Sequence, residues 1–225
     1  MIYGDETYTE AEVKIPDVNE VLQSSNLYVY CGNNPVMSID PTGMYERNLV
    51  VNYAKTYYSK RAYATEDVYL KNGDCAHFVS NCLRVGLLHQ SDDWYMNVSL
   101  GIYNRMIGSY SRSWTVALDQ YQIFSDPSKG YTSGTISIWS NEGMKNAIKY
   151  QGIQEGDLIY FCGADGNYPH HAAIITSIRD EDIYYNAHSG SRNDEPLSEY
   201  VLSYVHGEYV KGTEVIVIVK IRDDA

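Results

Sequence analysis

Four apolar runs in the last third of the chain constrain its fold most. They occupy residues 157–162, 172–178, 183–188 and 214–221. Short runs rich in β-branched and aromatic residues, bounded by turn signals such as Gly156 and the acidic stretch 180–182, are typical of strands. The end of the chain is therefore predicted to form a sheet.

Helical patterns precede these strands. Ser, Asp and Asn favour helix starts and Gly favours helix ends, which defines the expected limits. A chain with helices first and a sheet later is predicted to be an α+β domain, with N-terminal helices packed on an antiparallel sheet. Residues 87–140 give no clear assignment. The predicted helices, with their capping residues, are 45–57, 74–85 (Asp74 and Gly86) and 141–150 (Asn141).

The first 43 residues have a sequence pattern that differs from that of the rest of the chain. Residues 1–25 are polar and acidic with weak periodicity, which predicts an irregular extension, and residues 26–30 alternate like a short strand. The Asp-Pro-Thr-Gly turn at 40–43 marks a domain boundary. Two segments follow from this, 1–43 and 44–225.

Charge and composition exclude several classes of protein. A net charge of −12 disfavours binding to nucleic acid. No run of 18 apolar residues predicts a membrane span, and the start lacks the basic and then apolar pattern of a signal peptide. Export is therefore expected only as part of something larger or by a dedicated machine. Four cysteines without a C-x-x-C pair predict neither a disulfide scaffold nor a structural zinc, and no cofactor is expected.

Cys75 is the strongest candidate for chemistry. It stands at the predicted first turn of the helix 74–85, where amide N–H groups and the helix dipole favour a thiolate. Cys82, in mid-helix, has the position of an ordinary core thiol. A core role for Cys75 remains the alternative on this argument alone.

A thiol nucleophile requires a base and a group that orients the base. His171 begins one predicted strand and His188 ends the next, so a hairpin brings them to the same end of the sheet. Asn186 lies on the same strand face as His188 by the period of two. His171 is thus the candidate base, and His188 or Asn186 the candidate orienting group.

Other histidines have plainer interpretations. His89 and His206 are expected at the surface, and His77 on the helix flank beside the site. A metal site built from Cys75, His77, Cys162, His170 and His171 is the competing hypothesis. Their spacing matches no established zinc pattern, so no metal is predicted.

Residues 26–43, which read Asn-Leu-Tyr-Val-Tyr-Cys-Gly-Asn-Asn-Pro-Val-Met-Ser-Ile-Asp-Pro-Thr-Gly, closely resemble the end of the core of Rhs/YD-repeat proteins. In that family the repeats form a β-cocoon shell, and a variable toxin or enzyme domain follows the Asp-Pro-x-Gly motif. The resemblance implies that residues 1–43 are the tail of a shell and that 44–225 is its payload.

A second resemblance covers most of 44–225. Its blocks follow the order of an amidase-domain family related to the papain-like NlpC and CHAP peptidoglycan hydrolases. The block at 74–83 is similar to that family's Asp-Cys-Thr-Asn-Phe-Val-Ser-Gln sequence. The remaining blocks are 113–114 (Ser-Trp), 156–159 (Gly-Asp-Leu-Ile), 170–176 (His-His-Ala-Ala-Ile-Ile-Thr) and 185–189 (Tyr-Asn-Ala-His-Ser) with Arg192.

This resemblance implies a papain-like fold with Cys75 as nucleophile, His171 as base and His188 as the third catalytic residue. His170 stands where the family often has Asp, and a supporting part is open for it. Asp74 is expected to cap the helix and could also orient a group in the site.

The leading expectation is a cysteine amidase or peptidase that cleaves bacterial peptidoglycan as an Rhs-linked antibacterial effector. An Rhs core shell and an immunity protein are its expected partners, and the periplasm or cell wall its place of action. The first alternative is a papain-like toxin (protease, deamidase or transferase) that acts on a protein in the target-cell cytoplasm. The second alternative is a non-catalytic module that binds glycans through the aromatic middle section, which contains Trp94, Tyr95, Tyr103, Tyr110 and Trp114.

Overall fold

The contacts within the chain divide it into two compact units, residues 1–39 and 40–225. The segment predicted as an irregular extension with a strand at 26–30 lies outside the described residues. The larger unit is described here. The computed structural model describes residues 44–59, 74–100, 106–163, 166, 168–201, 204–205, 208–209 and 214–225.

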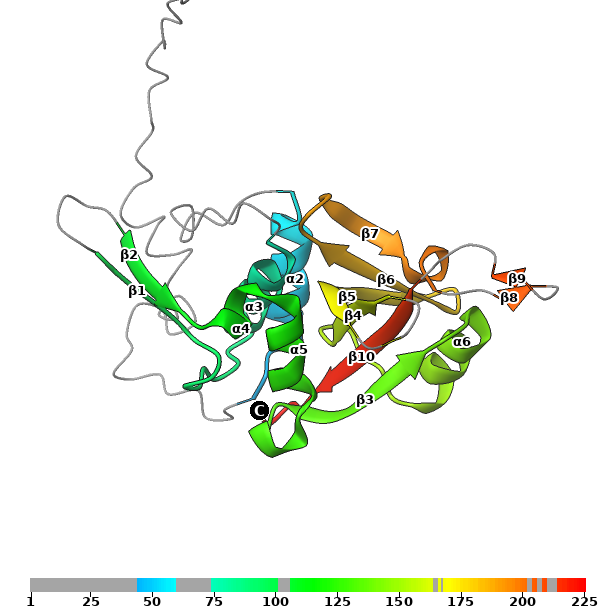
Figure 1. Cartoon of the computed structure of the whole chain (residues 1–225), viewed down its shortest axis with the longest axis horizontal. Helices are drawn as coiled ribbons and strands as arrows, with labels where there is room; N and C mark the ends of the chain where they lie inside the picture. The colour runs from blue at the N-terminus through cyan, green and yellow to red at the C-terminus, as the bar shows by residue number, and fades with distance from the viewer. Residues whose placement is uncertain are drawn as a thin grey trace, which may run out of the picture. The chain divides into compact units, whose positions relative to one another are not determined.

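A six-stranded sheet forms the centre of this unit, in the order β3-β10-β4-β5-β6-β7 (Figure 1). Every neighbouring pair in it is antiparallel, which confirms the predicted type of sheet. Two short hairpins, β1-β2 and β8-β9, stand apart from it. The strands are β1 (Met96–Leu100), β2 (Met106–Tyr110), β3 (Thr132–Ile138), β4 (Leu158–Cys162), β5 (Pro169–Arg179), β6 (Asp182–Ala187), β7 (Arg192–Pro196), β8 (Tyr204–Val205), β9 (Glu208–Tyr209) and β10 (Val215–Ile221).

The helices cover both faces of the sheet and confirm the mixed α+β class. The three predicted helices are present, and the unassigned middle section supplies two further α-helices. They are α2 (Arg47–Tyr57), α3 (Cys75–Val85), α4 (Arg112–Thr115), α5 (Ala117–Ser125) and α6 (Asn141–Tyr150), with 3-10 turns η4 (Pro127–Lys129) and η5 (Leu197–Glu199). No helix among the described residues is long and apolar enough to cross a membrane.

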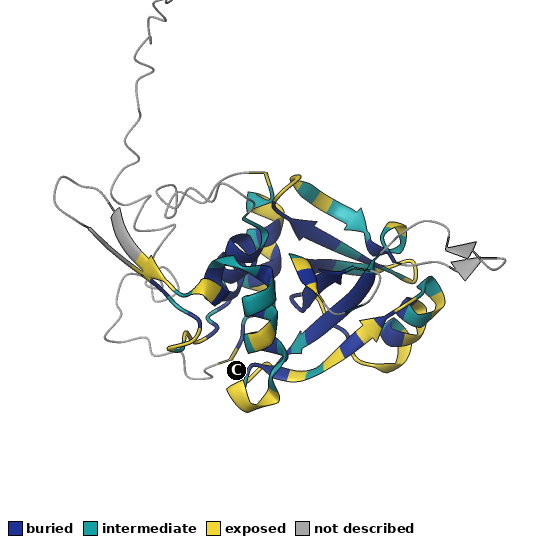
Figure 2. Ribbon diagram, viewed as in Figure 1, coloured by how far each residue is buried: buried dark blue, intermediate teal, exposed yellow. Residues whose placement is uncertain are grey.

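Strand periodicity divides the core between these two faces. In β4, Leu158 and Tyr160 pack with side chains of α2, α3 and α5, whereas Ile159 and Phe161 pack with side chains of α6. All of these residues are buried (Figure 2). Both faces are covered, so this strand is apolar throughout and was predictable as a continuous run.

Two predicted helix caps are corrected by the structure. Asp74 occupies the N-cap position of α3, but its side chain makes no capping hydrogen bond. At α6, Ser140 and not Asn141 is the cap, because its hydroxyl accepts a hydrogen bond from the Gly143 N–H. Gly86 ends α3 as predicted, where its N–H donates to carbonyl groups of the last turn.

Two residues of the aromatic middle section, which was considered from the sequence as a glycan-binding surface, lie in the core. Trp94 and Trp114 are fully buried and stack on each other, with ring centroids 4.8 Å apart. The Trp94 indole N–H donates to the Ser80 hydroxyl at 2.9 Å, which ties this section to α3. Tyr103 lies outside the described residues. These two tryptophans therefore belong to the core.

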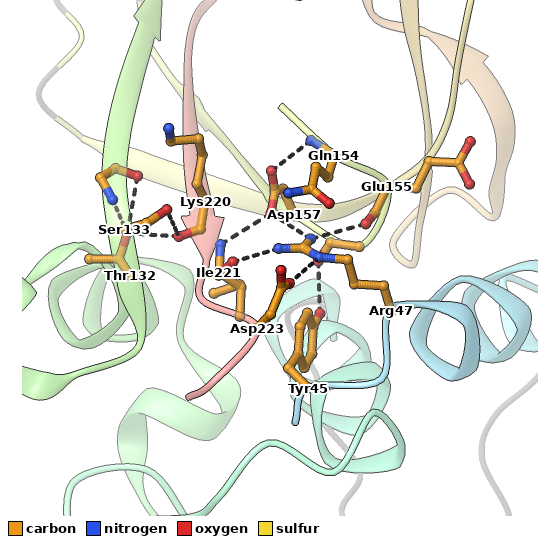
Figure 3. A network of polar contacts seen from close by, with 12 residues as sticks. Tyr45, Arg47, Thr132, Ser133, Gln154, Glu155, Asp157, Lys220, Ile221 and Asp223 are labelled. Atoms are coloured by element: carbon orange, nitrogen blue, oxygen red, sulfur yellow. Dashed lines mark hydrogen bonds and ion pairs between the residues drawn. The ribbon is translucent and has the colours of Figure 1, made fainter. Parts of the chain in front are cut away.

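A saturated polar network joins the two ends of the unit (Figure 3). Asp157 is buried before β4 and accepts hydrogen bonds from Arg47 and from the backbone N–H groups of Gln154 and Ile221, at 2.8 to 3.1 Å. Arg47 also donates to Asp223 at 2.7 Å. The Gly-Asp block read from the sequence thus anchors the start of α2 and the end of β10 to the sheet.

Candidate functional site

The start of α3 places Cys75 against the sheet. The thiol is half-buried, and it lies close enough to the backbone N–H of Ala172 in β5 for that group to stabilise its thiolate. Burial nevertheless raises the pKa of Cys75, and the N–H groups of Ala172 and Ala76 offset this only in part. The sequence argument that a helix start favours the thiolate is therefore outweighed by desolvation. A base is needed to ionise this thiol.

Asp74 and His188 form an ion pair next to Cys75. Nδ1 of His188 lies 2.7 Å from Oδ2 of Asp74, and Nε2 lies 2.7 Å from the Tyr57 carbonyl oxygen at the end of α2. Burial alone would raise the pKa of Asp74, but the hydrogen bond and charge of His188 outweigh it and lower that pKa. Both ring nitrogens therefore face oxygens that can accept a hydrogen bond.

Packing fixes the orientation of the His188 ring. It stacks on the Phe78 ring of α3, with centroids 4.3 Å apart and planes 19° apart. In the turn after β6, the Ser189 hydroxyl accepts a hydrogen bond from the Asp74 N–H at 3.1 Å. The His-Ser block is therefore joined to the helix start at two points.

His171 reaches the same end of the sheet, as predicted from the hairpin, but its ring turns away from α3. Its register partner in β4 is Phe161, and the two ring centroids are 5.3 Å apart. Phe161 belongs to the core on the α6 face, whereas Ala172 packs on the α3 face. Among the described residues, no hydrogen bond joins the His171 ring to Cys75 or His188.

Burial, followed by the charges of His170 and Arg192, lowers the pKa of His171 to about 4. The ring is therefore neutral near pH 7, which is the state a base requires. The assignment of His171 as base remains a prediction, and so does the orienting part of His188, which pairs with Asp74 instead.

The two other supporting residues are held elsewhere. His170 is half exposed, and its Nε2 lies 3.4 Å from Glu214. Asn186 is buried, and its side-chain amide bonds to Thr176, the Ala54 carbonyl, Asn193 and the Asp194 N–H. That amide has no capacity left for His171, so Asn186 connects α2 to the sheet.

His77 is a group that the sequence argument undervalued. It is 5% exposed, and neither ring nitrogen has a hydrogen-bond partner among the described residues. Burial lowers its pKa to about 4, while the charge of Asp74 acts in the opposite direction. The helix-flank position predicted for His77 does not reveal that the ring is covered, because the covering contacts are tertiary.

A buried amide supports the start of α3. Nε2 of Gln120 in α5 donates to the Ala76 carbonyl and to the Ser80 hydroxyl, both at 2.8 Å. The Tyr160 hydroxyl of β4 donates to Oε1 of Gln120 at 3.2 Å. Sequence spacing could not have identified this network, because its members come from three separate elements.

A metal site is not formed by these residues. Within the described parts of the chain, no three His, Cys, Asp or Glu side chains are arranged to hold a metal ion. The groups gathered at this end of the sheet are the thiol of Cys75, the carboxylate of Asp74 and the imidazoles of His171 and His188. This is the composition of a candidate hydrolase site.

A family model described as "putative amidase domain" matches residues 44–211. The match covers more than half of the chain, and the chain belongs to this amidase-domain family. The family indicates a hydrolase that acts on amide bonds. No curated protein and no solved structure matches the chain significantly. The Rhs-like segment 26–43 lies outside the match and the described residues, and its resemblance stays a prediction.

Proposed function

We propose that residues 44–225 form a cysteine-dependent amidase with a papain-like arrangement of nucleophile and base. The observation that carries the proposal is the position of Cys75 at the start of α3, next to the Ala172 N–H and the Asp74–His188 pair. A thiol at a helix start, with a histidine available as base and backbone N–H groups beside the sulfur, is the arrangement that acyl transfer needs.

The reaction begins with transfer of the Cys75 proton to His171. His188 cannot serve as this base while both of its nitrogens are engaged. The His171 ring must turn from Phe161 towards Cys75 for the transfer. Sulfur then attacks the amide carbonyl, the carbon–nitrogen bond breaks, and the leaving amine takes the proton from His171. Water hydrolyses the thioester to a carboxylic acid and restores the thiol.

Backbone groups at the helix start stabilise the transition state. The first N–H groups of an α-helix have no partner within the helix, and those of Cys75 and Ala76 lie close to the sulfur. They are the candidate donors to the carbonyl oxygen as it gains negative charge.

Peptidoglycan is the proposed substrate, on the strength of the resemblance to NlpC and CHAP hydrolases. In this proposal residues 1–43 belong to an Rhs shell that delivers the domain to the wall of a competing cell, which an immunity protein protects against. The test is dye release from purified, dye-labelled peptidoglycan by the full chain, its Cys75→Ala variant and a Cys82→Ala control. Release by wild type and control alone supports the proposal.

Dye release by Cys75→Ala equal to that by wild type, or no release from any wall preparation, would contradict the peptidoglycan proposal. Toxicity on cytoplasmic expression without toxicity in the periplasm would favour a protein target in the cytoplasm instead.

A further inference from the structure

Arg192 differs from most arginines of this acidic chain in the partners it has. Among the described residues, four others each hold a carboxylate oxygen at 2.6 to 2.8 Å. Arg84 lies in the last turn of α3, where the helix C-terminus favours a cation. Arg192 makes no hydrogen bond to any described residue, and its nearest carboxylate oxygen, on Glu195, is 3.9 Å away. The four paired arginines are Arg47, Arg112, Arg179 and Arg222.

Arg192 lies on the same face of the sheet as the His171 ring. Its register partner is Ala187, and that of His171 is Phe161. Ala187 and Phe161 both belong to the core on the α6 face. The charge of Arg192 is among the causes, after burial and His170, that lower the pKa of His171. The guanidinium therefore stands near the candidate base.

The guanidinium is supported but not saturated. It lies over the Tyr200 ring, 5.5 Å from the ring centroid, and a side chain at Gly190 would come within 3.5 Å of its Nε. The turn containing Gly190 also carries His188, so Arg192 lies beside the turn that leads from the Asp74–His188 pair into β7. Stacking on an aromatic face leaves the N–H groups at the rim of a guanidinium free to donate.

We propose that Arg192 is a substrate-recognition residue, which binds a carboxylate group of the amide substrate beside His171. A planar guanidinium with unused donors matches a carboxylate in two parallel hydrogen bonds. The substrates expected are therefore acidic peptides with a free carboxylate near the scissile amide. In the chain without substrate, the carboxylate of Glu195 is the one nearest to Arg192. In the proposed complex the substrate carboxylate lies closer to the guanidinium, at hydrogen-bonding distance.

This inference rests on the proposed function for treating the region as a substrate site, but its test measures binding alone. The full chain carrying Cys75→Ala is titrated with N-acetyl-L-Ala-γ-D-Glu-L-Lys and with the same peptide amidated at both carboxyl groups. Affinities are measured by calorimetry or by NMR shifts. We expect the acid to bind about 10- to 100-fold more tightly than the diamide.

The added Arg192→Gln substitution is expected to abolish this preference, and Arg192→Lys to retain part of it. The matched control, Arg179→Gln, removes an exposed arginine from strand β5 of the same sheet and is expected to retain the preference in full. Melting temperatures of all variants verify folding. Equal affinity for the two peptides, an undiminished preference in Arg192→Gln, or no measurable binding of the acid would overturn the proposal.

The two proposals fail separately. A carboxylate preference that depends on Arg192, together with wall hydrolysis that does not depend on Cys75, would leave the recognition site and remove the cysteine mechanism. Hydrolysis that depends on Cys75, without any carboxylate preference, would leave the cysteine mechanism and remove the recognition site.

Discussion

The Arg47–Asp157 network and the Cys75 site are both rich in polar groups, but they use them differently. Arg47 donates a hydrogen bond to Asp157, and the two side chains also bond to backbone groups of two segments, at 154–155 and at Ile221. In the site, neither ring nitrogen of His77 has a hydrogen-bond partner among the described residues, and no hydrogen bond joins the His171 ring to Cys75 or His188. Saturated groups hold a fold together, whereas unsatisfied reactive groups retain the capacity to act on a substrate.

The largest effect on activity is expected from Cys75→Ala. Loss of the nucleophile should lower the rate of amide hydrolysis by at least about 1,000-fold. The side chain is small and half-buried, so the melting temperature should stay close to that of wild type. Thermal unfolding and hydrolysis assays on the same preparation check both statements. A large loss of stability would assign Cys75 to the core instead.

The largest effect on stability is expected from Asp157→Ala. It removes the buried carboxylate that Arg47 pairs with and leaves the backbone N–H groups of Gln154 and Ile221 without their acceptor, and the free energy of unfolding should fall by about 3–5 kcal/mol. Denaturant unfolding measures the change. The control is Arg222→Gln, which removes the exposed pair with Asp224 and should leave the unfolding midpoint unchanged. If the two variants lose the same amount of stability, the Arg47–Asp157 network contributes no more than an exposed ion pair.

These two predictions differ in how far the sequence alone supported them. The start of α3 was predictable, because Asp74 and Gly86 delimit an apolar helix and Cys75 follows the cap directly. The strands β4, β5, β6 and β10 were predictable as continuous apolar runs. The strand β7, which reads Arg-Asn-Asp-Glu-Pro, was not, because an edge strand needs no apolar face and its composition is that of a loop.

The partners of the site residues were harder to predict than its members. His188 was identified, but its bond to the Tyr57 carbonyl involves a backbone group 131 residues away, which has no sequence signal. Asp74 was predicted as a cap that could also orient a group in the site; its side chain makes no capping hydrogen bond and bonds to the His188 ring instead. Successive side chains of β5 point to opposite faces of the sheet, so His171 points away from the face that carries Cys75. The spacing of the sequence motifs does not reveal this orientation.

A smaller loss of activity is expected from Asp74→Asn. The amide keeps the shape but removes the charge that holds His188, so hydrolysis should slow by about 10- to 100-fold. Steady-state rates test this, with Asp126→Asn, an exposed carboxylate at η4, as the control. Undiminished activity in Asp74→Asn would mean that the Asp74–His188 pair has a structural role and no role in catalysis.

The smallest effect is the dependence of stability on pH. The pKa values of His77 and His171 are about 4 in the folded chain, compared with 6.5 for a free imidazole. Between pH 6.5 and 4 the unfolded chain binds more protons, so stability should fall as the pH falls, by about 1–3 kcal/mol in all. Denaturant unfolding across this range measures the slope, and His77→Phe should flatten it. An unchanged slope in that variant would show that His77 titrates normally.

The most direct test of the central claim is acid-quench mass spectrometry of the full chain during hydrolysis of peptidoglycan fragments. The account predicts a transient acyl adduct on the peptide that contains Cys75, bound as a thioester and released by hydroxylamine. Hydrolysis at the wild-type rate in Cys75→Ser, with no adduct on Cys75 at any time point, would contradict it.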